Sequence, residues 1–175
     1  MADESKEPWL NLLALTTVLL AVCATFATFK GGGYSTKAIL CQTQASDQWA
    51  FYQAKSIKGS LYDLAREQAE IQAVGAPAAR TEELKRKAED YGRKVAKYDA
   101  ERAKIQADAL AFEETRKVAQ KHSAAFGNAV IALQIAILLS SIAALLKKKP
   151  VYYLGLALGA VGVVLFLNGF YLFMH

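Results

Sequence analysis

The chain has 175 residues, of which 54% are apolar and 21% are charged, and its formal net charge is +5. The charges are segregated, because residues 10–29, 123–146 and 151–174 contain no Asp, Glu, Lys or Arg. Uncharged apolar runs of about 18 or more residues are typical of membrane spans. This composition excludes an ordinary soluble globular domain. Two cysteines are also too few for a disulfide-built secreted scaffold.

The first predicted element is a membrane span over residues 9–29, which follows a short N-terminal tail of residues 1–8. At ~1.5 Å per residue, a helix of this length covers a hydrocarbon core of about 30 Å. The tail is net acidic, whereas the leader of a cleaved signal peptide is basic, so we expect a retained anchor. Three glycines at 31–33 predict a hinge after the anchor.

The central segment, residues 30–122, is predicted to be an extramembrane helical hairpin. Residues 31–122 carry 16 basic and 13 acidic side chains of interleaved sign. This pattern is typical of a solvated helix face and not of a nucleic-acid patch. A Gly-Ala-Pro sequence at residues 75–77 predicts the tip, and Thr81 predicts the N-cap of the second arm. At ~1.5 Å per residue, arms of about forty residues would project roughly 60 Å from the membrane.

Apolar side chains follow a four–three spacing along both predicted arms, roughly 35–74 and 81–122. This spacing is typical of the a and d positions of a coiled coil. Folding the chain at 75–77 pairs the two stripes, since the residue numbers of facing pairs such as Ile71 and Leu84 add to the same total of 155. We therefore predict an antiparallel coiled coil. Its predicted seam comprises Ala50, Ile57, Leu61, Leu64, Ile71, Leu84, Tyr91, Val95, Tyr98, Ile105 and Phe112.

A second stripe with the same spacing lies beside the seam on the second arm, and a smaller patch lies on the first arm. A second apolar face on an exposed hairpin indicates further helices around it, although alanine is also simply a good helix former. We predict a homo-oligomer in which hairpins bundle side by side. The predicted oligomer interface comprises Ala96, Ala100, Ala103, Ala107 and Leu110 on the second arm, and Trp49, Tyr62, Ala65 and Ala69 on the first.

The chain ends in two further predicted spans, residues 123–146 and 151–174, joined by a basic turn at 147–150. So short a connection makes the two spans antiparallel neighbours. The three lysines of the turn favour a cytoplasmic location, which puts the N-terminus in the cytoplasm and the hairpin in the periplasm. Basic residues beside the long central segment favour the opposite topology, but long loops carry little weight in this rule. Predicted packing residues in the membrane are Asn128, Gln134, Asn168, Gly155 and Gly159.

Candidate chemical sites are scarce in the sequence. His122 and His175 lack the convergent ligands that a metal needs, and no nucleophile elbow, phosphate loop or zinc-protease motif occurs. We therefore predict no catalytic residue, no metal and no cofactor. Cys41 lies outside the spans, where it would pair with another copy or be buried against a neighbouring helix, and burial is favoured.

Several motifs resemble a known family. They are Trp9-Leu10-Asn11, the run from Phe29 to Lys37, the run from Gln42 to Trp49, and Phe51, Tyr52, Gln53, Lys55, Ser56 and Ile57. Together they resemble the bacterial membrane family catalogued as domain of unknown function 4337, over essentially the whole chain. The resemblance implies a single anchor, a central helical region, a C-terminal pair of spans and a bacterial inner membrane. It implies no activity, cofactor or catalytic residue.

The leading functional prediction is a non-enzymatic scaffold protein of the bacterial inner membrane. Its predicted partners are the lipid bilayer and copies of itself, with no nucleic acid. Two alternatives stay open. Three spans per subunit would also suit an oligomeric channel or a transport accessory. The aromatic cluster of Trp49, Phe51 and Tyr52 would suit a docking adaptor for another envelope protein.

Overall fold

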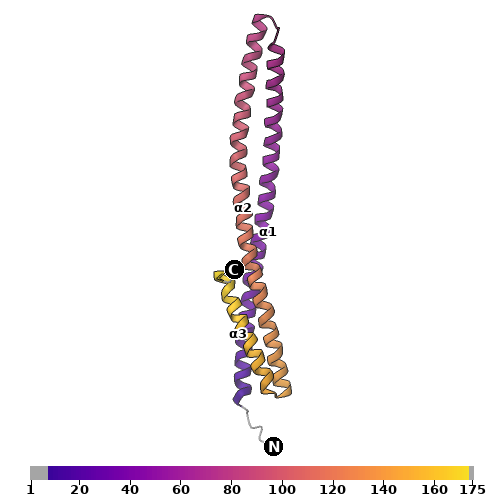
Figure 1. The fold of residues 1–175 in the computed structure, drawn as a ribbon. Coiled ribbons are helices and arrows are strands. Elements are labelled where there is room, and N and C mark those ends of the chain that lie inside the picture. The colour runs from indigo at the N-terminus through magenta and orange to yellow at the C-terminus, as the bar shows by residue number, and fades with distance from the viewer. Residues whose placement is uncertain (1–7, 174–175) are drawn as a thin grey trace, which may run out of the picture. The chain divides into compact units, whose positions relative to one another are not determined.

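The computed structural model describes residues 8–173, and these residues form three α-helices. α1 is Pro8–Ala73, α2 is Ala78–Leu146 and α3 is Lys149–Tyr171. The two long helices, of 66 and 69 residues, pack antiparallel (Figure 1). The predicted all-α class is confirmed. Apart from Pro8, the predicted tail of residues 1–8 lies outside the described residues, as does the last residue of the third predicted span.

All three helices are long and apolar enough to cross a membrane. Their most apolar windows have mean hydropathies of 2.2, 2.5 and 2.0 for α1, α2 and α3. Little of each window is buried by the protein itself, at 22%, 28% and 22% of its residues. Apolar helices that stay exposed in this way suit a surrounding of lipid, which supports a membrane location.

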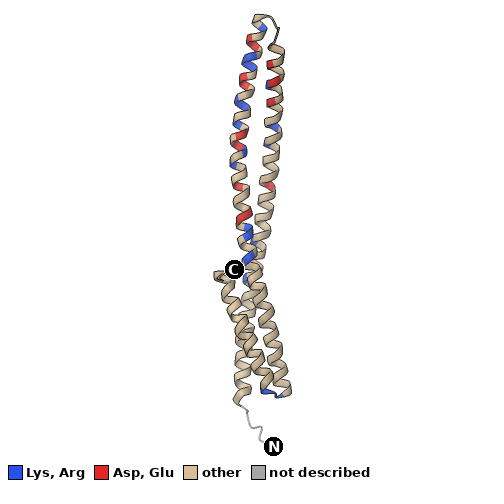
Figure 2. Cartoon of the chain, viewed as in Figure 1, with Lys and Arg blue, Asp and Glu red and all other residues tan. Residues whose placement is uncertain are grey.

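The chain forms two compact units, which we describe separately. The first unit, here called the bundle, takes the residues up to Ile39 and from Arg116 onwards, and it contains parts of all three helices. The second unit, here called the hairpin, is Leu40–Thr115 and contains the remaining parts of α1 and α2. Figure 2 shows that acidic and basic residues are interleaved along the hairpin. No Asp or Glu occurs among the described residues of the bundle.

Small side chains form most of the bundle core. Alanine on α1 and α2 lets the helices approach closely, and larger side chains fill the space between them. The buried residues make three successive layers along the helices. One layer is Leu13, Ala143 and Tyr152, the next is Leu20, Ala24, Leu133 and Ala136, and the third is Ala27, Phe126 and Ala129.

Glycines on α3 receive the larger core side chains of the other two helices. A Cβ added at Gly159 would lie 2.9 Å from the Leu20 side chain, and one at Gly162 would lie 2.8 Å from Leu133. Such distances are far below van der Waals contact, so these positions have no room for a side chain. Only two residues separate α2 from α3, so the two helices are held side by side at this end.

The predicted hinge at the three glycines is wrong. α1 continues through residues 31–33 without a break. Gly31 instead permits a close approach to α2, since an added Cβ would lie 3.1 Å from the Cβ of Phe126. Glycine weakens an isolated helix by about 1 kcal/mol per residue, but packing against a neighbour offsets that cost.

The hairpin turns between Ala73 and Ala78. Gly75 has a φ of +80°, a left-handed conformation that glycine adopts without strain. α2 begins at Ala78, so the predicted N-cap at Thr81 is wrong. Pro77 starts the helix earlier because its fixed φ suits a first turn, and its carbonyl accepts the Thr81 N–H at 3.0 Å. The Thr81 hydroxyl closes the tip by donating to the Ala76 carbonyl at 3.0 Å.

The inward face of α1 in the hairpin also differs from the predicted seam. The predicted residues Ile57, Leu61, Leu64 and Ile71 are 62%, 60%, 52% and 71% exposed, and Ala50 is exposed too. The buried positions of α1 in the hairpin are instead Cys41, Ala45, Gly59 and Ala69. A displacement of two residues, as from Ile57 to Gly59, rotates a helix by about 200° and moves the aliphatic stripe to the outside.

On α2 the structure buries the residues of the predicted seam. Leu84 is buried, and the other predicted seam residues of α2 are half-buried. Leu84 forms a cluster with Ala69 and Ala88 near the tip. The inward face of α1 therefore carries small residues at its buried positions, whereas α2 turns its predicted apolar seam inward. The half-buried residues of the predicted α2 seam are Tyr91, Val95, Tyr98, Ile105 and Phe112.

Candidate functional site

Aromatic rings hold the middle of the hairpin together. Tyr62 of α1 stacks on Tyr98 of α2 with ring centroids 5.7 Å apart, and its ring lies 5.9 Å from that of Tyr91. Gly59 lies beside this stack, and an added Cβ would make an ordinary van der Waals contact with Tyr98 at 3.7 Å. Aromatic pairs contribute about 0.5–1.5 kcal/mol beyond the area they bury. Stacking of this kind turns the tyrosine face of α1 inward.

Polar bridges across the hairpin join the same two faces. The Trp49 indole N–H donates to Glu113 at 2.8 Å, and the Arg102 guanidinium donates to the Tyr52 hydroxyl at 3.0 Å. The sequence gives a weak signal for these bridges, since charged residues interrupt the seam of α2 at Arg102. Trp49 and Tyr62 were predicted at the oligomer interface, and Ala69 beside them. Within one chain these three side chains pack inside the hairpin, and the oligomer interface itself stays a prediction.

One ion pair crosses between the arms. The Lys55 ammonium lies 2.5 Å from the Glu101 carboxylate. The hydrogen bond that Lys55 donates to Glu101 lowers the pKa of the Glu101 carboxyl and raises the pKa of the Lys55 ammonium. The ammonium also lies 5.2 Å from the centroid of the Tyr98 ring, a cation–π distance. Sequence reasoning missed this pair because neither residue belongs to an apolar stripe.

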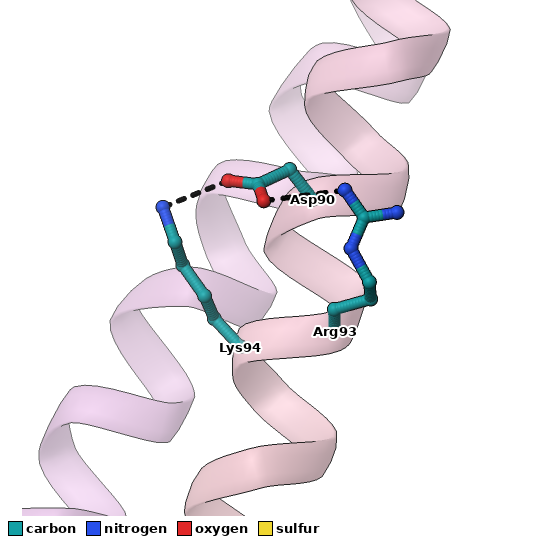
Figure 3. Close-up of polar contacts among 3 residues, drawn as sticks. All are labelled: Asp90, Arg93 and Lys94. Carbon is teal, nitrogen blue, oxygen red and sulfur yellow. Dashed lines mark hydrogen bonds and ion pairs between the residues drawn. The ribbon is translucent and has the colours of Figure 1, made fainter.

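Ion pairs along α2 lie on its solvated side. Asp90 bonds both Lys94 at 2.8 Å and Arg93 at 3.3 Å (Figure 3). The hydrogen bond from Lys94 lowers the pKa of the Asp90 carboxyl, and Arg93 adds to that effect. Glu83 pairs with Lys87 about two turns further toward the tip. Such surface pairs support the helix and give no sign of a chemical site.

The outer faces of the hairpin carry two apolar stripes. On α1 the stripe, here called the aliphatic stripe, is Ala50, Ala54, Ile57, Leu61 and Leu64, all exposed. On α2 the stripe, here called the alanine stripe, is Ala96, Ala100, Ala103, Ala107 and Leu110, also all exposed. Of the remaining predicted interface residues, Ala65 is half-buried. The described residues thus leave two unpartnered apolar faces on a charged, water-compatible unit.

In the bundle, the predicted packing residues divide into two groups. Gly155, Gly159 and Asn168 of α3 are buried. Asn128 and Gln134 of α2 are exposed. The two exposed amides are therefore not part of the packing inside one chain.

A histidine contact in the bundle was not predicted. The His122 ring stacks on Tyr34 with centroids 4.5 Å apart, and its Nδ1 lies 2.8 Å from the Gly169 carbonyl oxygen. Beside it, the Ser123 hydroxyl donates to the Gly31 carbonyl at 3.1 Å. These contacts join α1, α2 and α3 at one level. No local pattern in the sequence predicts these contacts, because the partners are about fifty to ninety residues apart.

Within residues 8–173 the structure brings together no group of three or more His, Cys, Asp and Glu side chains suited to a metal ion. Cys23 is half-buried and Cys41 is buried, and both thiols are free. The features of the chain that invite a functional explanation are therefore its exposed apolar faces.

Comparison with curated proteins and with solved structures found no match. Comparison with protein families did, and the matched region spans nearly all of α1 and the whole of α2 and α3. The family model described as Domain of unknown function (DUF4337) matches residues 9–172, so the chain belongs to this family.

Proposed function

We propose that the protein is a membrane scaffold whose hairpins associate side by side into a homo-oligomer. In this proposal the three apolar helical segments lie in a bacterial inner membrane, and the charged hairpin stands in water on its periplasmic side. The function is structural, as a spacer or docking platform built from repeated hairpins, and it involves no catalysis. The aliphatic stripe of α1 is the observation that carries the proposal.

The aliphatic stripe is unusual for a surface in water. Ile57, Leu61 and Leu64 follow coiled-coil spacing but face away from the partner helix of their own chain. Contiguous exposed apolar surface marks an interaction site. A helix with apolar residues on two opposite faces is expected to pack against two neighbours. The hairpin supplies one neighbour, so a second is expected outside the chain.

The alanine stripe of α2 provides a complementary surface. Ala100 lies two residues after the inward-facing Tyr98, so it points away from α1 by about the same 200° rotation. The aliphatic and alanine stripes therefore lie on opposite edges of the hairpin. One edge presents large side chains and the other presents small ones, which suits knobs-into-holes packing between copies.

The two stripes also match in height along the hairpin. Gly59 and Tyr98 lie at one level, and their residue numbers add to 157. Pairs of stripe residues with the same total lie at equal heights, for example Ile57 with Ala100 and Leu61 with Ala96. Copies anchored in one membrane share one direction, so α1 of one copy meets α2 of the next in antiparallel orientation and in this register.

The mass of the particle tests the proposal. The full-length protein in mild detergent is expected to run as an oligomer by mass photometry. Leu61→Glu places a charge in the aliphatic stripe and is expected to reduce the particle to smaller species, without loss of helix content by circular dichroism. Ser60→Glu adds the same charge at the neighbouring exposed position outside the stripe and should leave the oligomer intact. A wild-type monomer, or equal masses for both variants, would reject the proposal.

A further inference from the structure

A third exposed stripe lies on α2 within the bundle. Its members follow coiled-coil spacing over the whole apolar segment and include one large polar side chain. The stripe comprises Gly127, Ile131, Gln134, Leu138, Ser141 and Leu145, all exposed. We infer that this stripe, here called the glutamine stripe, is a second contact between copies of the chain, in which Gln134 amides bond to one another inside the bilayer. The inference rests on the membrane location and self-association proposed above.

Gln134 is at the centre of the uncharged run 123–146, with eleven residues of the run before it and twelve after it. At ~1.5 Å per residue it lies about 16 Å from either end, which is the middle of a hydrocarbon core. Water is scarce at that depth, so a side-chain amide needs a protein partner. Asn128 is also exposed, but it lies five residues from the start of the run and is therefore much nearer to one end.

Several hydroxyl groups of the apolar segments are satisfied inside their own helix. The hydroxyls of Thr17, Thr25 and Thr28 on α1 each donate to the carbonyl four residues earlier, and Ser141 on α2 does the same. Gln134 is different, because none of the described residues gives its side chain a hydrogen bond. Its side chain is exposed in the chain by itself.

The packing inside the chain leaves the glutamine stripe free. The bundle uses the other side of α2, where the buried residues contact α1 and α3. Gln134 follows Leu133 and precedes Ala136, both buried, and lies on the side that these residues do not use. The buried residues on the opposite side of α2, which the bundle uses, are Phe126, Ala129, Leu133, Ala136, Ser140 and Ala143.

A second copy of this chain is the occupant that the chemistry favours. An amide carries both donors and an acceptor, so it can bond with an identical amide in each direction. Copies that share one membrane place Gln134 at the same depth, so a contact along the glutamine stripe brings the amides together. Leu138 and Ile131 on either side would pack as apolar knobs around them. A single polar residue in such a seam also fixes its register.

Energy transfer between labelled copies tests the inference. The full-length protein is labelled with donor and acceptor dyes and diluted into vesicles of phosphatidylethanolamine and phosphatidylglycerol. Gln134→Leu is expected to weaken association roughly tenfold in protein-to-lipid ratio, the effect of one interhelical amide contact. Gln134→Asn should recover part of it, because a shorter amide remains. Asn128→Leu removes an exposed amide outside the glutamine stripe and should leave association unchanged.

The measurement is repeated with Leu61→Glu in the hairpin, which separates the two contacts. Weaker association for Gln134→Leu in that background supports the inference even where the hairpin proposal fails. Unchanged association for Gln134→Leu in both backgrounds would overturn it and leave the hairpin proposal standing. Unchanged association with altered ion flux would also overturn it, since the amide would then face a water-filled path. Equal losses for Gln134→Leu and Asn128→Leu would overturn the role of the stripe.

Discussion

The bundle and the hairpin are both built from long antiparallel helices, yet different types of side chain pack in their interiors. In the bundle, alanine and glycine bring helices close, and large apolar side chains such as Leu133 and Phe126 are fully buried. In the hairpin, the inner face mixes tyrosine, alanine and charged side chains, while the aliphatic residues of α1 point outward.

The proposed location of the bundle in lipid and of the hairpin in water explains this difference. In lipid, moving an apolar side chain from the lipid-facing surface to the protein interior brings no hydrophobic gain in free energy. Close packing of small residues therefore decides which face of a helix turns inward. In water, an exposed aliphatic stripe is costly unless something covers it. The outward stripe of the hairpin is therefore the part of the molecule that most needs a partner, and the following predictions test this contrast.

The largest effect is expected from filling the bundle seam. Gly162→Val would force side-chain atoms into Leu133, where an added Cβ would already lie 2.8 Å from Leu133 Cγ. Overpacking of this kind is expected to lower the free energy of unfolding of the bundle by about 3 kcal/mol. Thermal unfolding in detergent measures it. Gly32→Val, where no atom lies within 4 Å of an added Cβ, should change stability by less than about 0.5 kcal/mol.

A pair of neighbouring residues distinguishes the inner and outer faces of α1. Tyr62→Ala removes the ring that stacks between Tyr91 and Tyr98, and it is expected to lower the hairpin's stability by about 2 kcal/mol. Leu61→Ala removes an exposed side chain and should cost less than about 0.5 kcal/mol in a monomer. Hydrogen exchange of the full-length protein, diluted until monomeric, measures both. A larger loss of stability for Leu61→Ala than for Tyr62→Ala would instead favour the seam predicted from sequence.

Trp49→Phe tests the polar bridging of the hairpin with a smaller change. The substitution keeps an aromatic ring but removes the indole N–H that donates to Glu113. We expect a loss of about 1 kcal/mol in local stability, seen as faster amide exchange around both residues. Phe51→Leu, at an exposed position two residues away, is the control and should leave exchange unchanged. Equal exchange in both variants would mean that the bridge contributes nothing.

Acid should affect the stability of the two units differently, and this is the smallest of the four effects predicted here. The pKa values of Glu101, Asp90 and Glu83 are lowered in the hairpin by hydrogen bonds from lysines. A lowered pKa contributes stability at pH above the unfolded value of about 4, and that contribution is lost as pH falls through the folded value. Amide hydrogen exchange is measured at pH 5 and at pH 3 and corrected for intrinsic rates. In the hairpin it should be faster at pH 3 than at pH 5. The described bundle has no carboxylate side chain and should not respond; a response confined to the bundle would contradict this account.

The helical class, the three apolar segments and the break near Gly75 were all predictable, because each depends on local composition. On α2 the predicted stripe faces inward in the hairpin, since Leu84 is buried and Tyr91 and Tyr98 pack against Tyr62 of α1. On α1 the same rule selected Ile57 and Leu61, which are outward.

The error has a physical cause. Periodicity locates an apolar face but does not say whether its partner belongs to the same chain. The face that packs inside the chain is marked by Gly59, Tyr62 and Lys55, whose contacts are stacking, close approach and an ion pair. The contacts of His122 were equally hidden, because they join three helices that are distant in sequence.

Cross-linking between copies tests the central claim most directly. Ile57→Cys in one population and Ala100→Cys in another are mixed in the membrane, in chains whose native Cys23 and Cys41 are replaced by alanine. The account predicts disulfide-linked dimers of the two populations, and no bond within a chain carrying both substitutions, because Ile57 and Ala100 lie on opposite edges of one hairpin. A bond that forms only within one chain, or no bond between copies, would contradict it.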